Sequence, residues 1–190
     1  MAAALGDVAR CNPDAELQLW CQGEARVGRK GRGTRVWFER GVRPEGVADR
    51  RYASAWIYGA VRPGTDDAFA LVLTETGAAA MQAFLDRFAR SLAPGVHAAL
   101  LLDQAGWHVA KAIAVPANVG LVHLPPCSPE LNPVERVWLY LRERFLSHRL
   151  FADLGAVVEG CCDAWNRLRA EPGRIASLTD YPYLRSVRTS

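Results

Sequence analysis

A proline-rich run in the second half of the chain constrains the fold more than any other stretch. Residues 124–138 read LPPCSPELNPVERVW, with three prolines among the first six residues. Prolines at this density exclude an α-helix and predict an extended loop. Asn132 then offers a helix N-cap, and Pro133 suits the first position of a helix. The run therefore predicts a loop followed by a helix with a defined start.

The predicted helix has one apolar face and one acidic residue in its first turn. Its apolar residues Val134, Trp138, Leu141 and Phe145 recur at helical spacing. Glu135 lies near the positive end of the helix dipole, so we expect its carboxylate to be fixed in place and held ionised. An acidic first turn is also typical of an ordinary capped surface helix. A functional role requires a second carboxylate from elsewhere in the chain.

Length and composition indicate one soluble globular domain. The chain has 190 residues, of which 50% are hydrophobic and 23% charged. No apolar run approaches the ~18 residues that cross a bilayer, and the first residues do not resemble a signal peptide. We therefore expect a cytoplasmic protein with no membrane partner. The five cysteines form no CxxC pair, which predicts reduced thiols and no zinc site.

Hydrophobic periodicity predicts an alternation of strands and helices after a frayed lead-in of residues 1–15. A domain of residues 16–190 would follow this lead-in. The expected strands are Leu17–Gln22, Tyr52–Val61, Ala68–Thr74, His97–Asp103 and Val119–Leu124, and the expected helices are Gly77–Leu92, Trp107–Val115, one from Pro133 and one capped by Asp153.

This order of elements predicts an α/β fold with a mixed sheet. Strands joined by short loops pair antiparallel, so the first three strands should form an antiparallel group. A strand that follows a helix returns parallel through a right-handed crossover, and the helices then cover the sheet faces. Ligands of such sheets bind at the carboxyl ends of the strands. We expect Gly23, Asp103 and the start of the Glu135 helix near that edge.

Asp103 and Glu135 form a candidate metal-binding pair. Two carboxylates brought together by folding repel each other unless a cation lies between them. Mg²⁺ favours oxygen ligands and takes few of them from protein. Two such ions about 3.5–4 Å apart can support phosphodiester cleavage. Pairs of acids at this spacing are also common by chance, so the pattern alone leaves both interpretations open.

Three segments of the chain resemble a known family. Residues 102–108 (LDQAGWH), 124–138 and 164–168 (AWNRL) are similar to the IS630 family of bacterial insertion-sequence transposases. That family is part of the IS630/Tc1/mariner group, which has a DDE catalytic domain. The resemblance extends from about Glu16 to near the C-terminus and implies an RNase H-like fold. It also implies that Asp103 is the second catalytic acid and Glu135 the third, and that both bind Mg²⁺ or Mn²⁺, with two ions in a competent relative.

The resemblance fails at the first catalytic acid. The family pattern resembles Trp-x-x-Asp-Glu-Ala-Arg-x-Gly, whereas residues 20–28 read WCQGEARVG, with Gly23 in place of the Asp. Glycine has no side chain to bridge two metals. Glu24 should point to the opposite face of the strand, and only a local bulge could make it a substitute. We therefore expect a transposase catalytic domain with impaired cleavage and strand transfer, or alternatively a non-catalytic DNA-binding or subunit-pairing remnant.

A basic segment follows the first strand. Residues 24–52 hold nine Arg or Lys and four acids, a surplus of five in a chain whose net charge is only +3. We expect a basic hairpin insertion at about residues 26–50, which could contact DNA phosphates or simply be solvated. His108 could contact substrate, although a lone histidine is more often structural. The candidate DNA-binding residues are Arg26, Arg29, Lys30, Arg32, Arg35 and His108.

The implied partners are the DNA of the element ends and the target, together with a second copy of the chain or an active transposase subunit. The family usually carries a helix-turn-helix domain before the catalytic domain. Too few residues precede the first predicted strand to form one, so we expect this domain to be absent.

Overall fold

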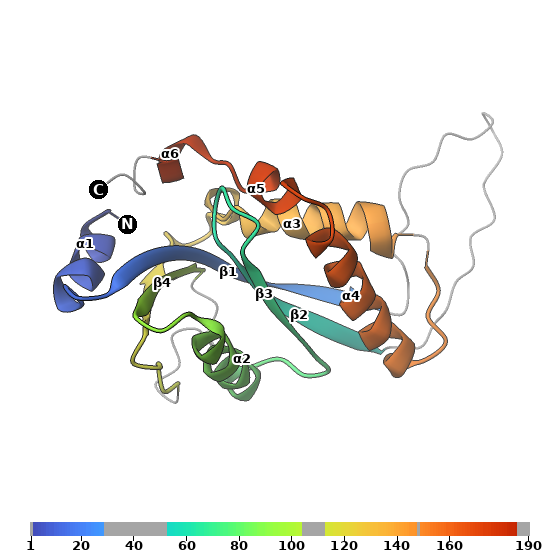
Figure 1. Cartoon of the computed structure of the whole chain (residues 1–190). Helices are drawn as coiled ribbons and strands as arrows, with labels where there is room; N and C mark the ends of the chain where they lie inside the picture. Colours follow the sequence, from blue (N-terminus) through green and yellow to red (C-terminus); the bar gives the residue numbers. More distant parts are fainter. Residues whose placement is uncertain (1, 29–52, 104–112, 148, 186–190) are drawn as a thin grey trace.

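The computed structural model describes residues 2–28, 53–103, 113–147 and 149–185, and its centre is a mixed sheet of five strands in the order β3-β2-β1-β4-β5 (Figure 1). β1 pairs antiparallel with β2, and β2 with β3, whereas β4 pairs parallel with β1 and β5 with β4. The predicted sheet topology is confirmed. The strands are β1 (Glu16–Gly28), β2 (Ser54–Val61), β3 (Ala68–Leu73), β4 (Val96–Leu102) and β5 (Val119–His123).

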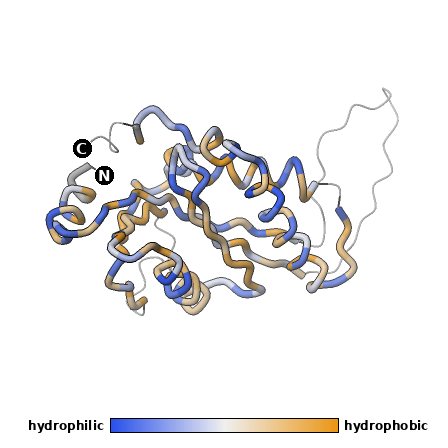
Figure 2. The backbone as a smooth tube through the Cα atoms, in the orientation of Figure 1, coloured by the Kyte–Doolittle hydropathy of each residue, from blue (hydrophilic) through white to orange (hydrophobic). Residues whose placement is uncertain are grey.

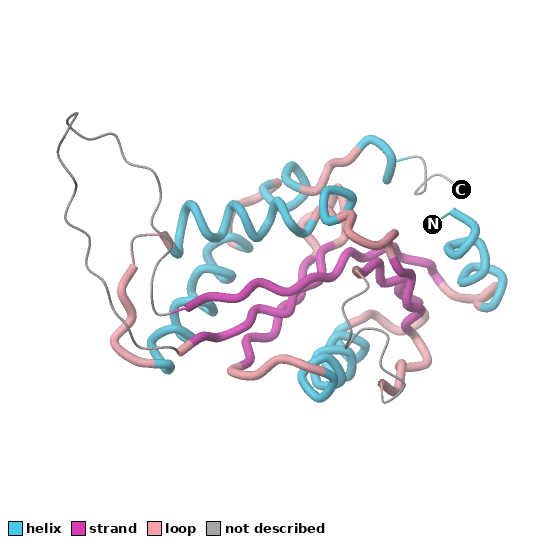
Figure 3. Tube along the Cα trace, turned by 180° about the vertical axis from the view of Figure 1, so that it is seen from behind, coloured by secondary structure: helices cyan, strands magenta, loops and turns pink. Residues whose placement is uncertain are grey.

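Helices cover both faces of this sheet (Figure 3). One face is covered by α2 (Ala78–Ser91), and the opposite face by α3 (Val134–Leu141) and α4 (Leu154–Arg169). Hydrophobic residues are concentrated along the strands between these layers (Figure 2). Among the described residues, no helix combines the length and apolar character that spanning a bilayer would require.

β1 is longer than the sequence predicted. We expected it to end at Gly23 and Glu24, but it continues to Gly28. Its register with β2 is unbroken from Cys21 to Gly28. β1 therefore stays paired with β2 beyond Cys21, where its parallel pairing with β4 ends. Arg26 is therefore a strand residue rather than part of a hairpin insertion. The rest of the predicted hairpin, from residue 29, lies outside the described residues.

The predicted lead-in is wrong, because residues 2–11 form a helix, α1 (Ala2–Cys11). Leu5 of this helix is buried in the core, and Val8 packs against it. The helix ends before Asn12, whose side-chain amide donates to the carbonyl oxygen of Val8 at 2.9 Å. The turn signal at Asn12 and Pro13 therefore marks the end of a helix.

The proline-rich run folds into a loop with one turn of 3-10 helix, η1 (Pro129–Leu131), which the sequence did not predict. α3 begins at Val134, and its C-terminus continues as the π-helical turn η2 (Arg142–Leu146). The predicted apolar face of this helix is confirmed by burial, because Trp138 and Leu141 are each 1% exposed. Two short helices, α5 (Arg174–Leu178) and α6 (Pro182–Arg185), complete the described chain.

Two further predictions concern the remaining helices. A helix over Trp107–Val115 was expected, but residues 113–115 are not helical, and the segment before them lies outside the described residues. The cap of α4 is confirmed, because the Asp153 carboxylate accepts a hydrogen bond from the Ala156 amide at 2.8 Å. All five cysteines are free thiols, as expected.

Candidate functional site

Just beyond the last paired residues of β1 and β4, position 23 lies level with Asp103. In the parallel register of these strands, Cys21 lies opposite Leu101. Two further residues along each chain lead to Gly23 on one side and Asp103 on the other. Because strand side chains alternate, both positions share the face of Cys21 and Leu101, which is the face that α3 covers.

Asn132 attaches the start of α3 to this part of the sheet. Its buried amide group donates to the carbonyl oxygen of Gln22 at 2.7 Å, and its side-chain oxygen accepts from the Val134 amide at 3.3 Å. The sequence predicted Asn132 as the N-cap of this helix. The structure shows that it binds the first helical amide while holding the helix start against β1, next to Gly23.

Glu135 has an acidic neighbourhood. Burial raises the pKa of its carboxyl group, the nearby Arg142 guanidinium lowers it, and the carboxylates of Asp103 and Glu24 each raise it. The net shift is upward, opposite to the effect that we expected from the helix dipole. Because Asp103 and Glu24 influence this pKa, an acid at the end of β4 and one on β1 each lie within electrostatic range of Glu135.

Position 23 is covered closely by α3. A Cβ atom at Gly23 would lie 2.7 Å from Cγ1 of Val134, 3.2 Å from Nε1 of Trp138 and 3.8 Å from Nδ2 of Asn132. The first of these distances is shorter than van der Waals contact, so a side chain at position 23 would require Val134 to move. The absence of a side chain at position 23 is therefore accompanied by close packing of the helix on the strand.

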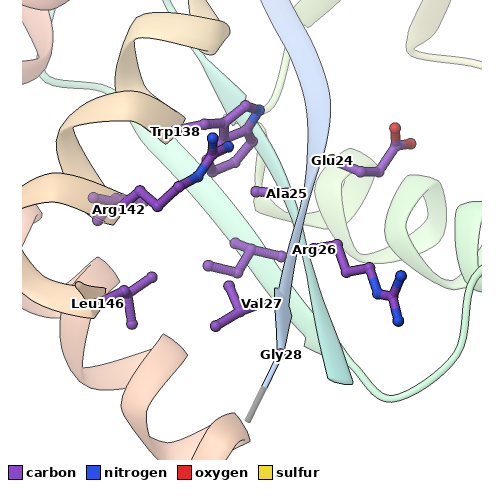
Figure 4. Close-up of a pocket in the computed structure, with 10 residues that line it drawn as sticks. Glu24, Ala25, Arg26, Val27, Gly28, Trp138, Arg142 and Leu146 are labelled. Carbon is purple, nitrogen blue, oxygen red and sulfur yellow. The ribbon is translucent and has the colours of Figure 1, made fainter. Parts of the chain in front are cut away.

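Glu24 points away from α3. Its carboxylate accepts a hydrogen bond from Nε2 of Gln22 at 3.0 Å, on the α2 side of β1. Figure 4 shows Glu24 and Arg26 on one side of the strand, and Trp138 and Arg142 on the other. Since the register of β1 continues without a bulge, the rearrangement that would turn Glu24 toward position 23 is not present. The negative charge of Glu24 nevertheless contributes to raising the pKa of Glu135.

The carboxylates suit a magnesium ion better than a soft metal. Within the described parts of the chain, no three His, Cys, Asp or Glu side chains form a cluster that could hold a metal on their own. Mg²⁺ needs only one or two protein carboxylates, because water and substrate phosphate complete its shell. Asp103 and Glu135 offer two carboxylates, which is the number that one such ion requires.

A cavity of about 410 Å³, with Glu24 in its lining, lies between the outer part of β1 and the α3–η2 helix (Figure 4). Its lining combines apolar side chains with Glu24 and two cationic side chains, Arg26 and Arg142, of which sequence reasoning missed Arg142. The available signal was spacing, since Arg142 follows Glu135 by seven residues and so lies on the same side of the helix. The residues that line the cavity are Glu24, Ala25, Arg26, Val27, Gly28, Ile57, Trp138, Leu141, Arg142 and Leu146.

The structure places only one of the candidate DNA-binding residues. Arg26 lies on β1, and its Nε donates to the hydroxyl of Ser54 at 3.2 Å. The other candidates lie outside the described residues: Arg29, Lys30, Arg32, Arg35 and His108.

Comparisons with known proteins agree with this architecture. The family model described as "DDE superfamily endonuclease" matches residues 18–158. An "Uncharacterized protein y4pE/y4sA" of Sinorhizobium fredii (strain NBRC 101917 / NGR234) is 48% identical over 124 residues, which cover 65% of this chain and 92% of the relative.

Solved structures of Mos1 transposase share the fold. A "Mos1 transposase paired-end complex with left transposon end" matches with a TM-score of 0.64 and 16% identity, over 94% of this chain and 55% of that chain. A "Mos1 mariner paired end complex with Mn" gives 0.61 and 15%, over 95% and 62%. The chain thus spans less than two thirds of the Mos1 chains that it matches. The predicted RNase H-like fold is confirmed by this likeness.

Proposed function

Because the chain belongs to the DDE superfamily of endonucleases, we propose that residues 16–190 are a transposase catalytic domain of IS630 type with impaired activity. What supports this proposal is that three chain positions lie toward the place where β4 ends beside β1. Gly23 and Asp103 are level on neighbouring parallel strands, and the charge of Asp103 acts on Glu135. The missing carboxylate is then the reason for impairment.

Asp103 and Glu135 are the residues that would hold Mg²⁺ or Mn²⁺. A bound divalent ion supplies charge neutralisation at the phosphate and lowers the pKa of water. Arg142 lies close enough to lower the pKa of Glu135, which favours the ionised form that a metal requires. The matching Mos1 structures include complexes described with a transposon end, with Mn and with Mg. These descriptions support element-end DNA as the substrate and a divalent ion as the cofactor.

With glycine at position 23, the proposed site lacks one charged group at its centre. Loss of one preorganised stabilising group from an active site typically slows the chemical step by about 10²–10³-fold. We therefore expect cleavage of element-end DNA to be very weak in the natural protein. Glu24 does not replace the missing group, because it lies on the other face of β1 and hydrogen bonds with Gln22.

The test is magnesium-dependent nicking of DNA that carries the ends of the element surrounding the gene. We expect negligible nicking by the natural protein and increased nicking after Gly23→Asp. The same variants are also tested in a protein that carries Val134→Ala. This change removes the methyl group that a Cβ at position 23 would meet at 2.7 Å. Gly23→Asn is the matched control, since it adds the same volume without the charge. Asp103→Asn should abolish any recovered activity.

Two outcomes would contradict the proposal. Robust cleavage by the natural protein would refute the impairment. A complete absence of cleavage in folded Gly23→Asp, with and without Val134→Ala, would refute the assignment of Gly23 as a vacated catalytic position.

The close packing around Gly23 also favours a second candidate, a non-catalytic remnant that binds DNA or pairs with a second copy or an active transposase subunit. Such a protein needs no carboxylate at position 23. It should bind DNA without divalent ions, with an affinity that falls steeply as salt rises. Arg26→Glu should weaken this binding if the outer part of β1 contacts phosphates. DNA binding that requires Mg²⁺ would instead favour the catalytic assignment.

A further inference from the structure

The indole of Trp138 on α3 packs directly against two glycines of the sheet. Gly23 of β1 and Gly59 of β2 are directly opposite each other in the antiparallel register. A Cβ at Gly59 would lie 2.5 Å from Cη2 of Trp138, and a Cβ at Gly23 would lie 3.2 Å from its Nε1. The indole, which is 1% exposed, therefore contacts strand backbone at two points. Its position is fixed tightly by the fold.

The Trp138 indole N–H has no hydrogen-bond acceptor among the described residues, although the nitrogen is fully buried. Buried indole N–H groups normally find a partner. Trp20 shows the usual arrangement, because its Nε1 donates to the side-chain oxygen of Gln18 at 3.1 Å. An apolar side chain at position 138 would fill the same space without burying an unmatched donor. The unmatched donor is therefore a feature that packing alone does not explain.

The unmatched N–H lies beside the one position that lacks its expected side chain. The carboxylate oxygens of an aspartate lie two bonds beyond its Cβ. With a Cβ 3.2 Å from Nε1, an oxygen of such a carboxylate is within hydrogen-bond reach of the indole. A hydrogen bond from a neutral donor to a carboxylate is charge-assisted, so it would both orient the acid and stabilise its ionised form.

We infer that Trp138 is the positioning residue for an acidic side chain at position 23, and that its unmatched N–H is what remains of that contact. The inference rests on the proposed function for the identity of the acid, but the hydrogen bond itself can be tested without DNA or metal. Partners that orient a metal-binding carboxylate in this way are a general feature of metal sites. Trp138 acts through the acid and does not touch the substrate.

The experiment is nuclear magnetic resonance on ¹⁵N-labelled protein in the Val134→Ala background, with Gly23→Asp compared with Gly23→Ala. Both changes add a Cβ, and only the first adds an acceptor. The Trp138 indole signal is identified by its loss in Trp138→Phe. We expect this signal to move downfield and to exchange more slowly with solvent in Gly23→Asp, and to remain unshifted in Gly23→Ala.

A second readout is the pKa of the introduced carboxyl group, followed by its ¹³C chemical shift. A hydrogen bond to the ionised form lowers this pKa. We expect the pKa to be about one unit lower with Trp138 present than in Trp138→Phe, which corresponds to a roughly tenfold effect on protonation. A purely structural tryptophan would leave the pKa unchanged, because phenylalanine preserves most of the packing.

An indole signal that is the same in folded Gly23→Asp and Gly23→Ala, with a carboxyl pKa insensitive to Trp138→Phe, would overturn the inference. Gly23→Ser serves if the aspartate variant does not fold, since its smaller side chain still offers an oxygen beyond Cβ. An unshifted indole signal in that variant would also count against the inference. A shifted signal together with absent DNA cleavage would instead contradict the proposed function and leave the hydrogen bond established.

Discussion

The two faces of the sheet bury their aromatic side chains in different ways. On the α2 face, Phe84 meets other rings: it stacks on Phe88 with centroids 5.8 Å apart and lies 5.7 Å from Phe69 and 6.1 Å from Tyr58. On the α3 face, Trp138 lies 6.0 Å from Trp165 between ring centroids, and it also meets bare backbone at Gly23 and Gly59. The first arrangement is a cluster of rings in mutual contact, and the second leaves the indole N–H of Trp138 without an acceptor among the described residues.

The two kinds of packing predict opposite responses of stability to substitution. A face that packs ring against ring loses stability when a side chain is made smaller. A face that packs a ring against glycine loses stability when a side chain is added. Trp138 gives the α3 face this second character, and Gly23 lies on that face beneath the helix that carries Glu135. The predictions below follow this contrast.

The largest effect is expected on the α2 face. Phe84→Ala removes a fully buried ring, so it should lower the free energy of unfolding by about 3–5 kcal/mol. Urea unfolding followed by circular dichroism measures this loss. A loss below about 1 kcal/mol would show that the α2 face is not a tightly packed core.

A smaller loss is expected when a methyl group is added beneath Trp138. Gly59→Ala places a Cβ 2.5 Å from the indole ring, and overpacking of this kind costs about 1–3 kcal/mol of unfolding free energy. Gly28→Ala is the matched control on the neighbouring strand, because the nearest atom to its Cβ is 3.9 Å away. The control should change stability by less than about 0.5 kcal/mol. Equal effects of the two substitutions would remove the contrast between the faces.

The α3 face should also respond to acid through His97. This imidazole is 7% exposed, its Nε2 has no hydrogen-bond partner among the described residues, and burial lowers its pKa from 6.5. The unfolded chain therefore binds a proton more readily than the folded one, so the free energy of unfolding should fall as the pH drops below about 6.5. His97→Gln should reduce this slope in urea unfolding measured between pH 7 and pH 5. An unchanged slope would show that His97 is not responsible.

The smallest change is expected for Trp138→Phe in the natural protein. The substitution loses ring volume but also removes a buried donor without an acceptor, which costs about 1–3 kcal/mol where it occurs. The two contributions oppose each other, so the free energy of unfolding should change by less than about 1 kcal/mol. A loss above 3 kcal/mol would indicate that the indole N–H is satisfied and that the α3 face is an ordinary core.

The sequence was sufficient to predict most of the sheet, because hydrophobic runs and turn residues carry that signal locally. β4 was recognised as a buried strand from its continuous apolar residues, and all seven are buried. α1 was missed, because only the neighbouring strands show that Leu5 and Val8 face a core. The end of β1 was misplaced for a similar reason, since its continuation depends on pairing with β2.

The site was predictable only as far as residue chemistry allows. Asp103 and Glu135 were predicted from their types and from the family resemblance, and the Asp103 carboxylate contributes to the raised pKa of Glu135. The packing of Val134 and Trp138 on Gly23 depends on how α3 lies on the sheet, which no local pattern encodes. Arg142 and the unmatched indole N–H were missed because their importance arises from tertiary neighbours.

Anomalous scattering from crystals soaked in Mn²⁺ tests the central claim most directly. The account predicts an ion coordinated by the carboxylates of both Asp103 and Glu135 in the natural protein, and a second ion only after Gly23→Asp. The account would be contradicted if saturating Mn²⁺ left both carboxylates without an ion, or if the two carboxylates held separate ions on different sides of the sheet.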